Sequence, residues 1–338
     1  MKRLLITGIT GFVGSHLAEY LLGLGVEVHG LLRWRSPRDN ILHIEDRLSL
    51  HEADLTDLPS LIRVLEDISP EYIFHLAAQS YVPYSYRAPI ATLNTNVLGT
   101  TTLLEAVRTA EMLGVDPVVV VCSSSEVYGQ VRREDLPIRE TCPLRPVSPY
   151  GVSKVAEDLL GQMYHIAYGL RTVRARLFTH TGPRRGEVFA ESSFARQIAR
   201  IEAGLQESTV RHGNLDSMRC WLDVRDAVRA YWLLATNCPP GEVYNIAGDR
   251  QATVGEMLQH LISLSSRSED IRAEQEHGLQ RPSDVTWQIP DSSKFRSTTG
   301  WKPEIAFERT MKDLLDYWRE QVGFRTYPRD PGPIRGGD

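Results

Sequence analysis

The feature that most constrains this chain is a glycine-rich turn near its N-terminus. A short apolar run at residues 4–7 leads directly into the sequence GITGFVG at residues 8–14, and helical periodicity follows over residues 13–24. Three glycines at this spacing allow a tight turn and let backbone N–H groups approach a pyrophosphate at the helix N-terminus. The turn therefore predicts a dinucleotide site, with a ligand-free βα turn as the alternative. The residues expected to contact the cofactor here are Gly8, Thr10, Gly11, Phe12, Val13 and Gly14.

Short apolar runs alternate with helical patterns through the first half of the chain. Strands are predicted at residues 4–7, 26–32, 49–53, 72–76, 117–122 and 172–177. Helices are predicted between them at residues 13–24, 58–66, 89–113 and 149–168. Continuously apolar strands separated by helices indicate a parallel sheet covered on both faces. The predicted class is α/β, a doubly wound (Rossmann) domain over residues 1–178.

The pattern loosens in the second half, where we expect a smaller C-terminal α/β substrate lobe over residues 179–325. Segments near residues 220–247 are expected to return to the first domain. Helices are predicted at residues 194–203, 225–236, 253–265 and 310–321, and a strand at 243–246. Thr253 with Glu256 three residues on is a helix-start signature. The tail at residues 326–338 is rich in Pro, Gly and charge, and we expect it to be mobile.

Charge and cysteine content exclude several partners. The formal net charge is −5, which argues against nucleic acid or an anionic membrane as a partner. No apolar run is long enough to span a membrane. The four cysteines form neither a C-x-x-C pair nor a cluster with zinc spacing, so no metal site is expected. Reduced thiols and these absences predict a cytoplasmic protein.

The end of the second strand indicates which dinucleotide binds. An acidic side chain there would bind the ribose of NAD, but this chain has Arg33, Arg35 and Ser36 and no carboxylate. Guanidinium groups suit a 2′-phosphate, so NADP is predicted, with a solvated basic loop as the alternative. Further residues expected beside the cofactor are Asp54, Leu55, Ala77 and Gln79.

A Tyr/Lys pair follows the fifth predicted strand. Tyr150 and Lys154 are one helical turn apart, and the ammonium is expected to lower the pKa of the phenol. Both residues are also expected to contact the cofactor, Lys154 at the nicotinamide ribose. Ser124, at the carboxyl end of the same strand, is expected to donate to a substrate oxygen. Glu126 is a candidate carboxylate base, or alternatively a loop carboxylate that caps a backbone N–H.

Five sequence stretches carry a family resemblance. They are HLAAQS at 75–80, RPVSPY at 145–150, FTHTGPRRGE at 178–187, GNLD at 213–216 and RPSD at 281–284. With them the chain resembles the nucleotide-sugar epimerase/dehydratase branch of the extended short-chain dehydrogenases. The nearest families are GDP-mannose 4,6-dehydratase and GDP-4-keto-6-deoxy-mannose reductase. The resemblance implies catalytic roles for Ser124 and Glu126. It implies a GDP-hexose site at Ser125, Thr179, Arg184, Arg185, Asn214, Arg219 and Arg281.

Within that site, the resemblance places Arg219 and Arg281 on the diphosphate and Asn214 at the base. Surface structural roles are the alternative for both arginines. The chain departs from the family at Thr179, where Asn is usual and where the shorter side chain changes any contact with the sugar or with Glu126. The segment at residues 12–14 has the reductase form, whereas residues 184–187 and the basic loop favour the dehydratase.

We therefore predict an NADP-dependent GDP-mannose 4,6-dehydratase. The alternative is a GDP-4-keto-6-deoxy-mannose 4-reductase that uses NADPH. Another nucleotide-sugar epimerase or a decarboxylase is a third possibility. A non-catalytic NADP sensor is disfavoured because Ser124, Tyr150 and Lys154 are all present. The helices at residues 89–113 and 149–168 resemble those that form a dimer interface in this family, so a homodimer or homotetramer is expected.

Overall fold

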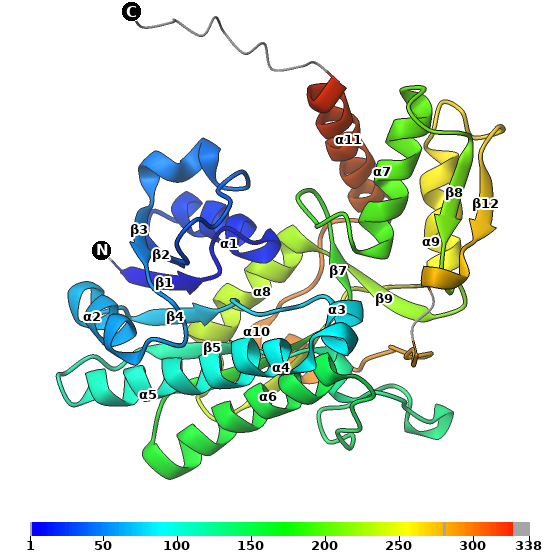
Figure 1. Cartoon of the computed structure of the whole chain (residues 1–338). Helices are drawn as coiled ribbons and strands as arrows, with labels where there is room; N and C mark the ends of the chain where they lie inside the picture. Colours follow the sequence, from blue (N-terminus) through cyan, green and yellow to red (C-terminus); the bar gives the residue numbers. More distant parts are fainter. Residues whose placement is uncertain (1, 280–281, 327–338) are drawn as a thin grey trace, which may run out of the picture.

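A parallel sheet of seven strands forms the centre of the molecule (Figure 1). The structure is a computed structural model that describes residues 2–279 and 282–326. The strand order is β10-β6-β5-β4-β1-β2-β3, and all neighbours are parallel. The strands are β1 (Arg3–Thr7), β2 (Glu27–Leu32), β3 (Ser49–Glu52), β4 (Tyr72–His75), β5 (Val118–Cys122), β6 (Thr172–Leu177) and β10 (Val243–Ile246). The predicted doubly wound α/β class is confirmed.

Helices cover both faces of this sheet and bury a separate apolar core on each. The first face carries α1 (Phe12–Gly23), α8 (Val224–Asn237) and α10 (Ser293–Thr299), and the second carries α2 (Leu58–Ile68), α5 (Gly99–Glu111) and α6 (Pro149–Tyr168). In β5, Val118 and Val120 belong to the first core, whereas Val119 and Val121 belong to the second. Successive side chains of a strand point to opposite faces. A strand covered on both sides is therefore apolar at every position, as the sequence predicted.

The helix predicted over residues 89–113 is interrupted. It consists of α4 (Pro89–Leu93), a π-helical turn η2 (Asn94–Leu98) and α5, which ends at Glu111. The π turn directs Asn96 inward, where its Nδ2 donates to the Gln79 carbonyl at 3.0 Å and to Ser153 Oγ at 2.9 Å. Such turns occur often at functional sites. A preceding short helix, α3 (Val82–Arg87), was not predicted because Pro83 and two tyrosines break the apolar periodicity.

The rest of the chain builds a smaller lobe above the carboxyl edge of the sheet. Its strands are β7 (His180–Thr181), β8 (Thr209–His212), β9 (Met218–Asp223), β11 (Arg250–Thr253) and β12 (Arg272–Gln275). They form a three-stranded sheet, β11-β9-β7, and a two-stranded sheet, β12-β8. The lobe's helices are α7 (Ala190–Glu202), α9 (Val254–Ser263) and α11 (Phe307–Thr326). Short 3-10 turns complete the molecule: η1 (Leu42–Arg47), η3 (Ser125–Val127), η4 (Arg133–Asp135) and η5 (His277–Leu279).

The sequence predicted the elements of the second half of the chain, from residue 179 on, less completely than those of the first half. The capping box at Thr253 and Glu256 is confirmed, with each side chain bonded to the other residue's backbone N–H. The predicted starts at residues 194 and 310 were wrong by one turn, since α7 begins at Ala190 and α11 at Phe307. None of the short strands of the lobe was predicted. In β12, for example, all four side chains are exposed, so no apolar alternation marks it. The predicted mobile tail lies outside the described residues except for residue 326.

Within residues 2–279 and 282–326, no helix combines the length and apolar character needed to cross a membrane. The same part of the chain contains no group of three or more His, Cys, Asp or Glu side chains arranged to hold a metal ion.

Candidate active site

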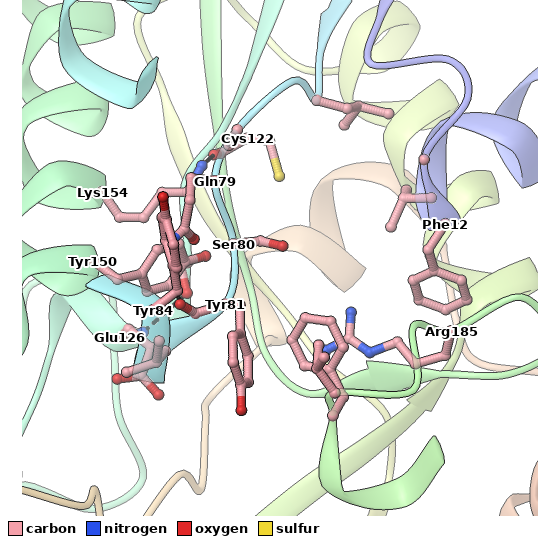
Figure 2. Close-up of a pocket in the computed structure, with 18 of the residues that line it drawn as sticks. Phe12, Gln79, Ser80, Tyr81, Tyr84, Cys122, Glu126, Tyr150, Lys154 and Arg185 are labelled. Atoms are coloured by element: carbon pink, nitrogen blue, oxygen red, sulfur yellow. Dashed lines mark hydrogen bonds between the residues drawn. The ribbon is translucent and has the colours of Figure 1, made fainter. Parts of the chain in front are cut away.

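A cleft of about 1050 Å³ lies at the carboxyl ends of the parallel strands, beneath the smaller lobe. Open α/β sheets bind their ligands at this edge. Its walls include the glycine turn after β1, residues 76–84 after β4, 122–126 after β5 and 177–180 after β6. Figure 2 shows Tyr150, Lys154 and Glu126 on one wall, with Phe12 and Arg185 across the cavity.

The glycine turn has the close-packed geometry of a pyrophosphate cradle. Gly8 has a φ of +72°, and a Cβ atom added to it by substitution would lie only 2.9 Å from the Ala77 backbone. A Cβ on Gly14 would lie 2.3 Å from the Gly8 carbonyl oxygen. Helix α1 starts at Phe12, directly after this turn, so its first N–H groups are at the cleft. The six turn residues predicted to contact a cofactor all line the cleft: Gly8, Thr10, Gly11, Phe12, Val13 and Gly14.

The two arginines of the basic loop after β2 have different surroundings. Arg33 and Ser36 line the cleft, and the Ser36 N–H donates to the Arg33 carbonyl at 3.0 Å. Arg35 is not among the residues that line it; its guanidinium lies 4.3 Å from the ring centre of Trp34, which is 71% exposed. One guanidinium and one hydroxyl of the predicted set therefore belong to the cleft lining, and this donor set fits NADP.

Asp54, Leu55, Ala77 and Gln79 all line the cleft, and their contact with a cofactor stays a prediction. Asp54 accepts hydrogen bonds from the Thr56 hydroxyl at 2.7 Å and backbone N–H at 2.8 Å, which lower the pKa of its carboxyl. The backbone N–H of Gln79 donates to Asn96 Oδ1 at 2.7 Å. The π turn thus fixes the segment after β4 through the contact between Asn96 and Gln79. Sequence periodicity could not reveal this contact.

Tyr150 and Lys154 lie on one face of α6, which begins behind the N-cap Ser148. Both side chains are buried and line the cleft, and Lys154 Nζ is 5.9 Å from the ring centre of Tyr150. Burial raises the pKa of Tyr150, while the charge of Lys154 and a hydrogen bond with Ser124 lower it. The predicted effect of Lys154 is therefore present, but burial outweighs it in this structure.

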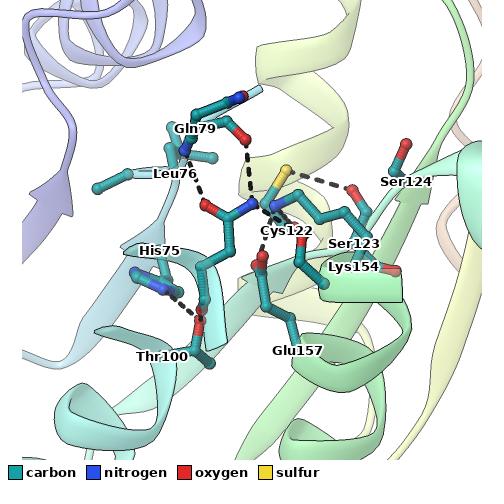
Figure 3. A network of polar contacts seen from close by, with 12 residues as sticks. His75, Leu76, Gln79, Thr100, Cys122, Ser123, Ser124, Lys154 and Glu157 are labelled. Atoms are coloured by element: carbon teal, nitrogen blue, oxygen red, sulfur yellow. Dashed lines mark hydrogen bonds and ion pairs between the residues drawn. The ribbon is translucent and has the colours of Figure 1, made fainter. Parts of the chain in front are cut away.

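Sequence reasoning missed Glu157, which lies behind Lys154. Lys154 Nζ donates to Glu157 Oε2 and to the Cys122 carbonyl, each at 2.9 Å (Figure 3). Burial raises the pKa of Glu157 to about 7, although Lys154 opposes this change. Burial also disfavours the charge on Lys154, but the Glu157 carboxylate raises the pKa of the ammonium above its usual value. The spacing of three residues along α6 is the signal that could have identified this pair.

Glu126 lies in the turn η3 after β5, at the same wall as Tyr150. Its backbone N–H donates to Ser124 Oγ at 3.2 Å, so Ser124 starts this turn. Its Oε1 accepts a hydrogen bond from Gln288 Nε2 at 3.3 Å, and Gln288 Oε1 in turn accepts from Thr179 Oγ1 at 3.3 Å. Ser124, Ser125, Glu126 and Thr179 all line the cleft, as does Gln288, which was not predicted.

Two of the predicted substrate arginines are in the cleft. Arg185 Nε is 3.1 Å from Glu191 Oε1, and its guanidinium lies 3.5 Å from the ring centre of Phe189. Arg219 extends from β9 and is 3.4 Å from Asp284. Asn214 is beside it and donates to the same carboxylate at 2.9 Å. The lobe thus presents cationic and amide groups to the cleft.

A third predicted arginine, Arg184, is not in the cleft. Arg184 has a φ of 69°, and its guanidinium points to α1, where it bonds Glu19 at 2.5 Å and His16 at 2.7 Å. It also donates to the Asn40 carbonyl at 3.1 Å. Arg184 thus connects the loop after β7 to the cofactor domain and is not among the cleft-lining residues. Arg281 lies outside the described residues.

The doubly wound sheet, the glycine turn and the Ser124, Tyr150 and Lys154 side chains at one sheet edge define a short-chain dehydrogenase of the extended type, with a second, smaller lobe. The sequence model described as GDP-mannose 4,6 dehydratase matches residues 5–314. This chain therefore belongs to the GDP-mannose 4,6-dehydratase family.

The relatives of this chain carry the names of two different activities, a dehydratase and a reductase. GDP-mannose 4,6 dehydratase 2 of Arabidopsis thaliana is 37% identical, over 93% of this chain and 86% of that protein. GDP-6-deoxy-D-mannose reductase of Pseudomonas aeruginosa is 34% identical, over 95% of this chain and 98% of that protein. A solved structure of RMD from Pseudomonas aeruginosa complexed with NADPH has a TM-score of 0.80 at 33% identity, over 95% of this chain and all of that chain.

Proposed function

We propose that this protein is an NADP-dependent GDP-mannose 4,6-dehydratase, which converts GDP-mannose to a GDP-4-keto-6-deoxy sugar. The observation that carries the proposal is the carboxylate of Glu126 in the same cleft as Tyr150 and Ser124. Elimination of water needs an acid/base group in addition to the Tyr/Lys pair. The family match over residues 5–314 and the dehydratase relatives support this function.

When bound, NADP supplies the hydride acceptor for C4 of the hexose and the hydride donor for C6. Tyr150 takes the proton of the C4 hydroxyl, while Ser124 hydrogen-bonds the same oxygen and Lys154 stabilises the phenolate. The resulting ketone acidifies the C5–H bond. Glu126 then removes the C5 proton and delivers a proton to the departing C6 hydroxyl, so that water is lost across C5 and C6. Arg185 and Arg219 supply positive charge for the diphosphate.

The second candidate is a GDP-4-keto-6-deoxy-mannose 4-reductase that uses NADPH. The reductase relative and the solved RMD structure favour it, because each covers at least 95% of this chain. In that reaction Tyr150 donates a proton to the C4 oxygen, and Glu126 has no required role. The two candidates therefore differ in what Glu126 does.

The test is to incubate the purified protein with GDP-mannose and NADP⁺. A 4-keto-6-deoxy product without net NADPH supports the dehydratase. Absence of turnover with GDP-mannose, together with NADPH oxidation by the 4-keto sugar, would establish the reductase instead. In the dehydratase, Glu126→Gln should lower the rate of water loss about 10²- to 10⁴-fold, as expected for loss of an acid/base group. The same variant should retain C4 oxidation, seen as NADPH that accumulates in a single turnover.

We further propose that the enzyme is a cytoplasmic homodimer or homotetramer. All four cysteines are free thiols, which supports a reducing compartment. Exposed apolar side chains gather on α4, on the adjoining turn η2 and on the helix α6 that packs against them, which supports an interface between copies. They are Ile90, Leu93, Leu98, Val152, Leu159, Met163 and Ile166. Those on α6 recur at helical spacing and so share one face. Light scattering of the protein and of an Ile166→Glu variant tests this assignment, because the charge should dissociate such an interface.

A further inference from the structure

The amide of Gln288 lies between two residues of the cleft wall. Its Nε2 donates to Glu126 Oε1 and its Oε1 accepts from Thr179 Oγ1, each at 3.3 Å. The residue is only 3% exposed, so its amide meets protein groups and not bulk water. Gln288 is 162 positions from Glu126 in the chain. It therefore connects the smaller lobe directly to the carboxylate that the sheet presents.

The backbone of the smaller lobe holds this amide in place. Gln288 N–H donates to the Met218 carbonyl at 3.2 Å, and Met218 N–H donates to the Thr286 carbonyl at 2.9 Å. These bonds attach the segment to the start of β9. Arg219 Nη1 also donates to the Val285 carbonyl at 2.8 Å. The segment that carries Gln288 is thus attached to an arginine that faces the diphosphate in the proposed function.

The chemistry of an amide suits a carboxylate that changes its protonation state. The Gln288 NH₂ group donates to Glu126 in the structure, a contact that suits a carboxylate. If Glu126 carries a proton, the rotated amide can accept from it through Oε1, because the Thr179 hydroxyl can either donate or accept. A hydroxyl at position 179 is therefore compatible with both states. The Thr179 hydroxyl bonds the Gln288 amide, and the longer Gln288 side chain provides the contact to Glu126.

We propose that Gln288 is a positioning residue for Glu126, which holds the carboxylate toward the reacting C5–C6 bond in both of its protonation states. The proposal rests on the proposed dehydratase function. It predicts that Gln288 affects the elimination of water and has no influence on the oxidation at C4, because its contact is with Glu126 and not with Tyr150.

The first variant is Gln288→Leu, which keeps the approximate volume and removes the amide. We expect kcat for dehydration to fall about 10- to 100-fold, the effect of one hydrogen bond to a charged group. KM for GDP-mannose should change less than about threefold, and NADPH should accumulate transiently because C4 oxidation outruns elimination. Gln206→Leu is the matched control, since Gln206 lies in the same lobe outside the cleft lining and bonds Gln197 and the Thr209 carbonyl.

Two further variants separate positioning from a general structural effect. In the Glu126→Gln background, Gln288→Leu should leave the residual rate of water loss unchanged within about twofold, because the two residues act as a unit. Thr179→Val keeps the amide and removes only its partner, and should lower kcat about 3- to 10-fold, as expected for a neutral hydrogen bond. This variant also tests the proposal if Gln288→Leu does not fold.

The outcomes are distinguishable. Wild-type protein that does not dehydrate GDP-mannose contradicts the proposed function. Wild-type dehydration with an unchanged kcat in folded Gln288→Leu overturns only the role of Gln288. Equal losses of C4 oxidation and elimination also overturn it, because the amide would then act on the whole site.

Discussion

Lys154 and Glu157 form an ion pair inside the protein, with Nζ 2.9 Å from Oε2 and side chains that are 4% and 1% exposed. Nζ also donates to the Cys122 carbonyl at 2.9 Å. These two contacts use two of the three N–H donors of an ammonium group. They fix the direction from which Lys154 acts on Tyr150, one helical turn earlier on α6.

We expect Glu157→Gln to lower the free energy of unfolding by about 1–3 kcal/mol, because Lys154 keeps an acceptor but loses the opposite charge. Burial raises the pKa of Tyr150 and the Glu157 carboxylate adds to this effect. The limb of the pH–rate profile that reports Tyr150 should therefore move to lower pH while Lys154 stays charged. Urea unfolding and kcat as a function of pH measure both effects. Glu111→Gln, an exposed change, is the control, and an unchanged profile in Glu157→Gln would contradict this role.

Arg33 and Arg35 should differ in their effect on cofactor binding. Arg33→Ala should weaken NADP⁺ binding about 10- to 100-fold, the effect of losing charged hydrogen bonds to a 2′-phosphate. Arg35→Ala is the matched control and should have a smaller effect, because Arg35 stacks on Trp34 and is not among the cleft-lining residues. Calorimetric titration with NADP⁺ and NAD⁺ measures this difference. Equal losses in the two variants, or an equal loss of NAD⁺ affinity, would contradict the assignment.

His75 should make the protein sensitive to acid. It is buried between Thr7 and Thr100, whose hydroxyl oxygens are each 2.9 Å from a ring nitrogen. Burial lowers its pKa from 6.5 to about 3, and Lys154 adds to this effect. The unfolded chain therefore binds a proton below about pH 6.5 that the native protein excludes, and stability falls as the pH decreases.

The expected contribution of His75 is a loss of about 2 kcal/mol between pH 7 and pH 5. His75→Gln should be less stable at pH 7, but its unfolding free energy should depend less on pH by that amount. Urea denaturation of both proteins at pH 7, 6 and 5 measures the difference. Parallel pH dependences would show that His75 does not carry this effect.

Asp158 should be essential for stability and not for chemistry. It is fully buried on α6 and lies 3.0 Å from Arg174 Nη1 and 2.8 Å from Arg176 Nε, both on β6. Asp158→Asn should lower the free energy of unfolding by about 3–5 kcal/mol, because two buried guanidinium groups lose their counter-charge. Asp116→Asn is the control; its exposed pair with Arg171 should contribute less than about 1 kcal/mol. The midpoints of thermal unfolding of the two variants measure this difference. Similar midpoints would contradict the prediction.

Local sequence signals were sufficient for the sheet and for much of the cleft lining near the glycine turn. The run of valines predicts the strand β5, and the spacing of the glycines near Gly8 predicts the tight turn. Both patterns depend on neighbouring residues alone. The pair of Tyr150 and Lys154 was predictable for the same reason, since one helical turn brings them together. The π turn around Asn96 was not, because it results from contacts with Gln79 and Ser153, which are distant in sequence.

The sequence by itself determined the class of fold, the glycine turn and most of the residues that line the cleft beside it, because periodicity and turn chemistry are local properties. Only the tertiary structure decided which arginines reach the cleft, because Arg184 and Arg185 are adjacent in sequence but point to α1 and to the cavity respectively. It also placed Gln288 against Glu126, since that contact exists only when the smaller lobe packs over the edge of the sheet. Contacts across 162 positions depend on how the whole chain packs, and no local pattern encodes them.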